Sequence, residues 1–393
     1  MTRQDLIAKA TQAWRLSANK LRLSRNSLIR ADLPTKVAAG MRLRRDDLIR
    51  VARVVIVSVV CVAFVLVITS VPRWGATHAL LGIHEAPAAK TTSAPLSVEQ
   101  AKSILARVFT AAYLGETTTG AASQEQLKTA YTGQGLRGVD GRVKLASVQS
   151  AVTTSPLLAP HPKLLAVSRG FGFPRFIVAQ TVASDGGLPV LHLLVSPDAA
   201  TPYRISMSVE MVPPATVQPF DRLTSGSPLV PNGTGPLVTK SAGLAVAPDT
   251  LLKLYATQMA FPAKTISKPP FAADPFSGQL QDAAAGVAEA VATQATFTQV
   301  HQVVPDSVYT VRVASGDALV FGVLQRTDSF AVKSSQNVNT AANKAFVLLT
   351  GRKLITKSAS ITTLEFVVFT VPQSTGQAKL VAAREQIVAG SGS

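Results

Sequence analysis

Histidine, cysteine and serine are the side chains from which this chain would have to build a reactive centre. None of the histidines forms an HExxH or another metal-ligand spacing, and the single cysteine, Cys61, adds no second ligand. There is no Gly-x-Ser-x-Gly elbow or phosphate loop, and neither Ser241 nor Ser358 begins a Ser-x-x-Lys motif. We therefore predict no catalytic, cofactor-binding or metal-binding residues and no enzyme activity. The histidines are His78, His84, His161, His192 and His301.

Two histidines and two glutamates fall inside segments with the alternation of a strand. His192 and His301 alternate with apolar neighbours, which is typical of a strand histidine whose nitrogens are hydrogen-bonded within the fold. Glu210 and Glu365 also lie in strand patterns, on an exposed face or in a cavity. Other carboxylates are predicted to hold backbone amides in turns, namely Asp185, Asp274 and Asp306.

Aromatic and basic side chains are the remaining candidates for ligand contact. Phe171, Phe173 and Phe176 surround Pro174, where we expect them to enter a core beside a sheet or to line a ligand cavity. The two arginines in these strand patterns either are solvated or reach an acid or a ligand; they are Arg175 and Arg204. Asn232-Gly-Thr234 fits a glycosylation sequon and is interpreted as a turn.

The positive charge is concentrated at the N-terminus. The chain of 393 residues has a net charge of +17 and 47% hydrophobic residues, enough for packed cores. Residues 1–53 contain 13 Lys and Arg against 4 Asp, a net +9. A basic arm beside an apolar segment indicates a surface of anionic lipid before it indicates nucleic acid.

An uncharged segment from Val54 to Val71 follows the basic arm. Its length approaches the roughly 20 residues that cross a hydrocarbon core, and a helix satisfies its own backbone there. Arginines cluster before it and are sparse after it, so the positive-inside rule predicts a cytoplasmic N-terminus and extracellular C-terminal domains. A buried core element remains an alternative, and so does a cleaved signal peptide ending near Thr77-His-Ala79.

The arm itself has helical spacing, with Ile7, Trp14, Leu21 and Leu28 seven residues apart among basic residues. A basic amphipathic helix on the membrane surface, or a flexible arm that orders on a partner, fits this pattern. Nucleic-acid contact is the least favoured, because Trp14 is the only aromatic residue there. Without a second cysteine the outer part has no disulfide, which suits a bacterial envelope.

Two rounds of helices followed by strands are predicted outside the membrane. Ser97 and Gln100 form a capping box for the first helix, a second covers Gln124–Tyr131, and Ser184-Asp-Gly-Gly187 predicts a hairpin. The first-round strands are Val143–Val152, Lys163–Ser168, Pro174–Ala183, Leu188–Ser196 and Tyr203–Val212.

The second round begins after a Pro- and Gly-rich stretch at 213–247. Its helices are predicted over Pro248–Met259 and Ser277–Ala292, and Gln377–Ile387 is left as a strand or a short helix. Its strands are Ala295–Val304, Tyr309–Ala314, Ala318–Phe330, Lys344–Leu349 and Thr362–Thr370. This α+β pattern indicates helices packed on one face of an antiparallel sheet, twice.

The predicted parts are a basic cytoplasmic arm at 1–53, a transmembrane helix at 54–72, a linker at 73–96, a first α+β domain at 97–212, a Pro/Gly-rich linker at 213–247 and a second α+β domain at 248–393.

Four stretches carry a resemblance to a known group of proteins. Phe171–Phe176, Thr201–Arg204, Pro270–Phe276 and Gly316–Asp328 resemble actinobacterial membrane-anchored or lipoprotein-like envelope proteins of unknown function, over roughly residues 97–371. The plan is also similar to the outer domains of conjugation and type IV secretion proteins. That similarity implies two tandem NTF2-like or cystatin-like domains, each of helices on a curved antiparallel sheet.

Function is expected to be non-catalytic. The first hypothesis is a membrane-anchored cell-envelope protein that binds or scaffolds other envelope proteins, wall components or itself. The second is an assembly subunit of a conjugative transfer or secretion channel. An envelope hydrolase is third, and the lack of a nucleophile–base set in the sequence argues against it.

Overall fold

The computed structural model describes residues 93–148, 162–170, 172–182, 187–230 and 243–393. Residues 86–393 form one compact unit. The predicted arm (1–53), transmembrane helix (54–72) and most of the following linker lie outside the described residues. Within the described ranges, no helix is both long enough and apolar enough to cross a membrane. The described part combines helices with antiparallel sheets, which confirms the α+β class.

Helices open the first half, as predicted. In α4 (Val98–Thr117) the Ser97 side chain accepts from the Gln100 backbone N–H, and the Gln100 side chain accepts from the Ser97 N–H. This reciprocal capping box satisfies two backbone donors at the helix start. The second helix is α5 (Ala121–Ala130), and a third helix, α6 (Gly133–Leu145), was not predicted.

A four-stranded antiparallel sheet, here the first sheet, follows these helices. Its order is β1 (Lys163–Val167), β2 (Arg175–Thr181), β3 (Val190–Ser196) and β4 (Arg204–Glu210). These strands confirm four of the predicted segments, with small differences at their ends. Thr181 pairs with Val190, so β2 and β3 form the predicted hairpin, whose turn lies partly outside the described residues.

The second half repeats the order of helices and then strands. Asp274 caps α8 (Pro275–Val291) by accepting from the Ser277 backbone N–H, and α7 (Pro248–Gln258) has proline in its first turn. The second sheet has the order β12-β11-β8-β7-β5, with β6 also paired to β8. Its strands are β5 (Leu229–Val230), β6 (Ala295–Val303), β7 (Tyr309–Arg312), β8 (Ala318–Val332), β11 (Ser358–Val371) and β12 (Lys379–Gly392).

The predicted strand at Lys344–Leu349 is wrong. The segment is helix α9 (Lys344–Thr350), inserted between the short strands β9 (Val338–Asn339) and β10 (Leu354–Ile355). Asn343 accepts from the Phe346 backbone N–H at its start, and Gly351 ends it with a φ of 69°. A short apolar run has no decisive period, so the cap residues on either side were the better signal.

The predicted strand at Val143–Val152 is also wrong where the structure describes it. Residues 143–145 are the end of α6, residues 146–148 form a turn, and 149–152 lie outside the described residues. Glycines normally weaken a helix, so the four at 133, 135, 138 and 141 kept the sequence from predicting α6.

The glycines of α6 allow the helix to touch the backbones of two strands. A Cβ at Gly135 would lie 2.6 Å from the carbonyl oxygen of Ser206 in β4. One at Gly141 would lie 2.5 Å from the carbonyl oxygen of Ile387 in β12. Helix α6 therefore packs at close range against both sheets.

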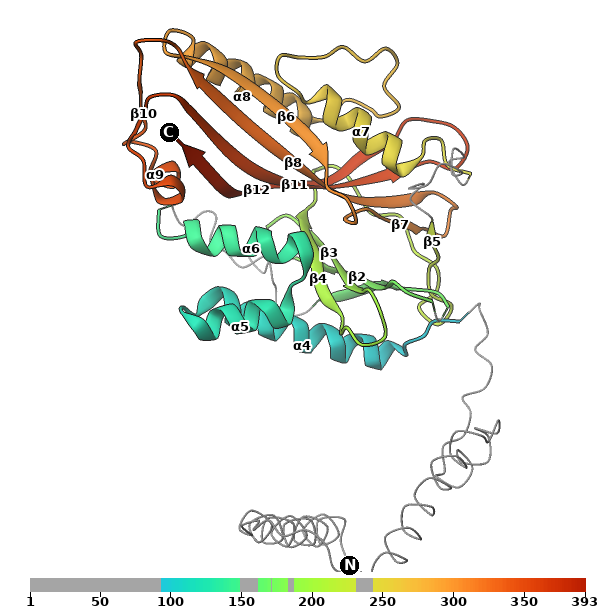
Figure 1. Ribbon diagram of the computed structural model, residues 1–393. Coiled ribbons are helices and arrows are strands. Elements are labelled where there is room, and N and C mark those ends of the chain that lie inside the picture. Colours follow the sequence, from blue (N-terminus) through green and yellow to red (C-terminus); the bar gives the residue numbers. More distant parts are fainter. Residues whose placement is uncertain (1–92, 149–161, 171, 183–186, 231–242) are drawn as a thin grey trace, which may run out of the picture. The chain divides into compact units, whose positions relative to one another are not determined.

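The two sheets pack face to face. Val178, Leu193 and Met207 of the first sheet share one buried core with Phe321 and Val368 of the second. The opposite face of the first sheet is covered by α4, α5 and part of α6, and the opposite face of the second by α7 and α8 (Figure 1). The layers therefore run helix, sheet, sheet, helix.

The predicted linker at 213–247 contributes to this arrangement over its described part. Val217 and Phe220 pack on the core between the sheets, and β5 pairs with β7. Just before it, the Val212 backbone N–H donates to the Val381 carbonyl of β12. The segment Gln377–Ile387, left open from the sequence, is strand β12. The division into domains at 97–212 and 248–393 stays a prediction.

Replacing the close-packed glycines of α6 tests its position. We expect Gly135→Ala and Gly141→Ala each to lower the free energy of unfolding by about 1–3 kcal/mol, because the new methyl group meets a backbone oxygen that cannot rotate away. Chemical denaturation of the full chain measures this. The matched control is Gly286→Ala in α8, where nothing lies within 4 Å and a gain of about 0.5–1 kcal/mol is expected. Equal effects at positions 141 and 286 would contradict the packing of α6.

Candidate functional site: a polar pocket where α6 meets both sheets

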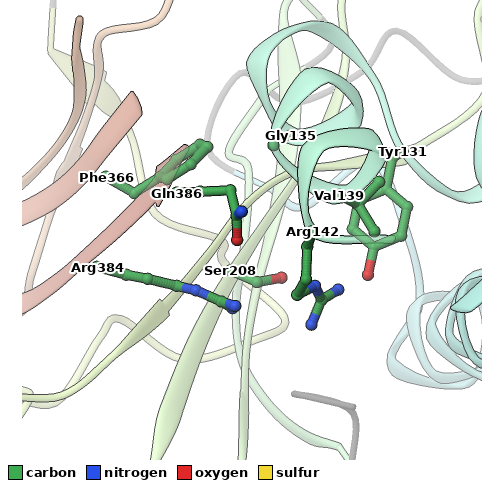
Figure 2. Close-up of a pocket in the computed structure, with 9 residues that line it drawn as sticks. Tyr131, Gly135, Val139, Arg142, Ser208, Phe366, Arg384 and Gln386 are labelled. Atoms are coloured by element: carbon green, nitrogen blue, oxygen red, sulfur yellow. The ribbon is translucent and has the colours of Figure 1, made fainter. Parts of the chain in front are cut away.

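A small pocket lies where α6, β4, β11 and β12 meet (Figure 2). Its volume is about 30 Å³, against roughly 10–15 Å³ for one enclosed water molecule. The pocket therefore has room for a small polar group rather than for a whole cofactor. Its walls are Tyr131, Gly135, Gly138, Val139, Arg142, Ser208, Phe366, Arg384 and Gln386.

One of the two arginines in the pocket wall is held by a buried carboxylate. The Arg142 guanidinium lies 2.6 Å from a carboxylate oxygen of Glu116, with 8% and 6% of the two side chains exposed. The Tyr131 hydroxyl also donates to Glu116. Burial, followed by the negative charge of Glu116, raises the pKa of Tyr131 well above its usual value. Glu116, Tyr131 and Arg142 thus form a self-contained group that joins α4 to α6.

The second arginine, Arg384, has no such partner. It extends from β12 to the pocket wall, where the residue is partly buried and its guanidinium nitrogens still reach water. Among the residues that the structure describes, none forms a hydrogen bond or ion pair with this guanidinium. Burial, followed by the positive charge of Arg142, lowers the pKa of Arg384 to about 10, while the charges of Glu210 and Glu116 oppose that change. Arg384 is therefore still a cation at neutral pH.

A buried histidine supports the pocket from the first sheet. The Nδ1 atom of His192 lies 2.9 Å from the Ser208 hydroxyl, and its Nε2 atom lies 2.8 Å from the Thr181 hydroxyl. The Phe109 ring packs edge-on against the imidazole. Both ring nitrogens have partners, as predicted for a strand histidine.

The contact between Ser208 and His192 is a nucleophile–base pair that the sequence did not reveal. The two side chains are close because of the register of β3 and β4, in which His192 pairs with Ser208 across the sheet. Burial, followed by the charge of Arg384, lowers the pKa of His192 to about 3, so the imidazole is a weak base. The other ring nitrogen meets a threonine hydroxyl rather than a carboxylate. This geometry favours binding over acyl transfer.

A second polar cluster lies inside the second sheet, around Glu365. The His301 Nδ1 atom is 2.8 Å from Glu365, and both side chains are fully buried. Arg326 contacts Glu365 at 3.2 Å, Glu385 at 2.7 Å and Asp328 at 3.2 Å. The sequence marked His301 and Glu365 separately, but their contact joins β6 to β11 and depends on the order of the sheet.

This second cluster is closed rather than reactive. The Gln299 amide nitrogen donates to the Met259 carbonyl, which fixes the amide orientation, and lies 2.9 Å from His301 Nε2. Nε2 is therefore an acceptor, and the Nδ1 proton points to Glu365. Burial raises the pKa of Asp328 above its usual value. Both imidazole nitrogens are occupied, so His301 has no free nitrogen to offer to a substrate.

The other residues singled out from the sequence are not part of either cluster, except Glu210, whose charge acts on Arg384. Asp274 caps α8 as expected of a turn carboxylate, and Phe176 is buried in the core. Phe173 is 40% exposed, and the Arg175 guanidinium lies 4.3 Å from the centre of its ring. Residues outside the described ranges are Cys61, His78, His84, His161, Phe171, Asp185, Asn232 and Ser241.

Comparisons with protein-family models, with curated proteins and with solved structures find no match for this chain. Within the described residues, no group of three or more His, Cys, Asp or Glu side chains is arranged to hold a metal ion.

The buried His192 predicts an acid-sensitive fold. In the unfolded chain the His192 imidazole takes up a proton near pH 6.5, whereas in the folded chain it is protonated only near pH 3. The free energy of unfolding should therefore fall as the pH drops through this window, by up to about 5 kcal/mol. In His192→Gln the part of the pH dependence that comes from His192 should vanish. Urea denaturation between pH 7 and 4 measures the free energy of unfolding of both proteins. Equal slopes in both proteins would show that His192 is protonated in the folded state as readily as in the unfolded chain.

Proposed function

We propose that this chain is a single-pass membrane protein of the cell envelope. The uncharged segment at 54–72 serves as the anchor, the basic arm at 1–53 stays in the cytoplasm beside anionic lipid, and residues 97–393 lie outside. The asymmetry of arginines around the segment supports this orientation. No Asp, Glu, Lys, Arg or His lies between Val54 and Val71, so the segment is a tether rather than a transport path.

The outer part acts by binding or scaffolding rather than by catalysis. The observation that carries this proposal is the core shared by the two sheets, which joins both halves into one packed body with a polar pocket at its margin. A rigid body of this kind presents fixed surfaces to partners in the envelope. His192 and His301, the two histidines within the described residues, are poor bases for hydrolysis, because the pKa of the first is low and both ring nitrogens of the second are occupied.

A narrower candidate is an assembly subunit of a conjugative transfer or secretion channel. Each half places helices on one face of an antiparallel sheet, and the similarity to NTF2-like or cystatin-like outer domains implies such an arrangement. The doubling of that plan after one membrane span supports this candidate. Similarity of plan does not by itself assign a role, so oligomerisation decides between the two.

Single cysteines test the orientation in the membrane. With Cys61 replaced by serine, we expect Lys353→Cys, at an exposed position, to react with a membrane-impermeant maleimide on intact cells. Ser24→Cys in the basic arm is the matched control and should react only after the cells are opened. Labelling of position 24 but not of position 353 on intact cells would reverse the proposed topology.

Cross-linking of the full chain in its membrane tests the narrower candidate. A channel subunit should give defined oligomers and should co-purify with a channel ATPase. A scaffold of the first kind should instead bring down other envelope proteins or wall components. A chain that stays strictly monomeric and has no neighbouring transfer genes would eliminate the channel role.

A further inference from the structure

We propose that the pocket between α6, β4 and β12 binds one carboxylate group, with the Arg384 guanidinium as its principal contact. The inference concerns a ligand of this chain and stands whether or not the chain is anchored in a membrane. The charges where α6 meets β4 and β12 are the first observation. Glu116 is already engaged by Arg142 and Tyr131, so it is not free to neutralise a second cation.

Arg384 is the cation that this arrangement leaves unsatisfied. Its guanidinium carries five N–H donors, and none of the described residues accepts a hydrogen bond from them. Water is therefore its partner in the free chain, and a second positive charge, Arg142, lies near enough to lower its pKa. Glu210 acts on Arg384 only at a distance, because no ion pair joins them. An anion in the pocket would supply the missing partner.

The other walls of the pocket suit a carboxylate in particular. Ser208 can receive the Nδ1 proton of His192 and so turn its own hydroxyl proton to the pocket. The Gln386 amide uses one N–H on the Ile387 carbonyl and has a second N–H to offer. Figure 2 shows both side chains beside Arg384. A planar two-oxygen anion matches the guanidinium fork and these two donors.

Size and polarity narrow the choice further. About 30 Å³ admits the planar group of a carboxylate. Phe366 and Val139 provide an apolar wall for the carbon atom that carries the carboxylate. The carboxylate would contact β4 through Ser208 and β12 through Arg384, and would therefore tie the two sheets together at their margin.

Acetate is the first probe. The full-length chain in detergent at pH 7 is titrated with sodium acetate, and sodium chloride and sodium sulfate serve as references at equal ionic strength. Melting temperature and calorimetry are the measurements. We expect a saturable rise in Tm with acetate that neither reference salt produces, because a ligand of the folded state stabilises it by mass action.

Variants assign the effect to Arg384. Arg384→Met should weaken acetate binding by about tenfold or more, and should raise the Tm without acetate because the repulsion between Arg384 and Arg142 is gone. Arg384→Lys keeps the charge but loses the fork, and should weaken binding to an intermediate extent. It also provides the test if the methionine variant does not fold. The matched control, Arg352→Gln, removes a charge from an exposed arginine and should bind acetate as the natural chain does.

A second probe distinguishes a free acid from a carboxylate on a partner chain. A short peptide with a free C-terminal carboxylate is compared with its amidated form. Tighter binding of the free peptide than of acetate would indicate a partner protein, and preference for acetate would indicate a small acid. Either result supports a carboxylate site.

Three results would overturn the proposal. The first is that acetate gives no more stabilisation than chloride. The second is that sulfate binds in its place. The third is that Arg384→Met lowers the Tm yet binds acetate normally, which would make Arg384 a structural partner of Glu116 and Glu210.

Discussion

The rest of this structure depends on the packing of one sheet against the other. Each sheet has a helix-covered face that is complete within its own half of the chain. The remaining faces are apolar, and neither half can leave such a face in water without losing the largest favourable contribution to folding. Burying them together, around residues such as Met207 and Phe321, joins the halves into one compact unit.

That packing also explains where the polar groups collect. Two apolar faces exclude water from the centre, so the charges outside the cluster around Glu365 gather where the sheets end and α6 fills the gap. Arg142 and Glu116 satisfy one another there, while Arg384 reaches the same place from the second sheet. The close approach of α6 requires glycine at 135 and 141. The pocket is therefore a consequence of the junction rather than a cleft within either half.

Local signals in the sequence predicted much of the secondary structure. The box formed by Ser97 and Gln100 marked the start of α4, and period-two alternation marked most of the long strands. Both errors occurred where the local pattern did not contain the deciding information. The residues of α9 form a short apolar run without a decisive period, and α6 contains glycines whose purpose appears only when the facing strand is in place. Neither the apolar residues of α9 nor the glycines of α6 were misleading in themselves.

By itself, the sequence determined the α+β class, the order of most elements and the expectation of a basic arm before an apolar segment, since all of these depend on neighbours along the chain. Tertiary structure alone decided that the two sheets share a core, that His192 meets Ser208, and that Arg384 lies in the pocket wall without a partner among the described residues. Those contacts join residues far apart in the sequence. Their existence depends on register and on packing of distant faces, which no local pattern encodes.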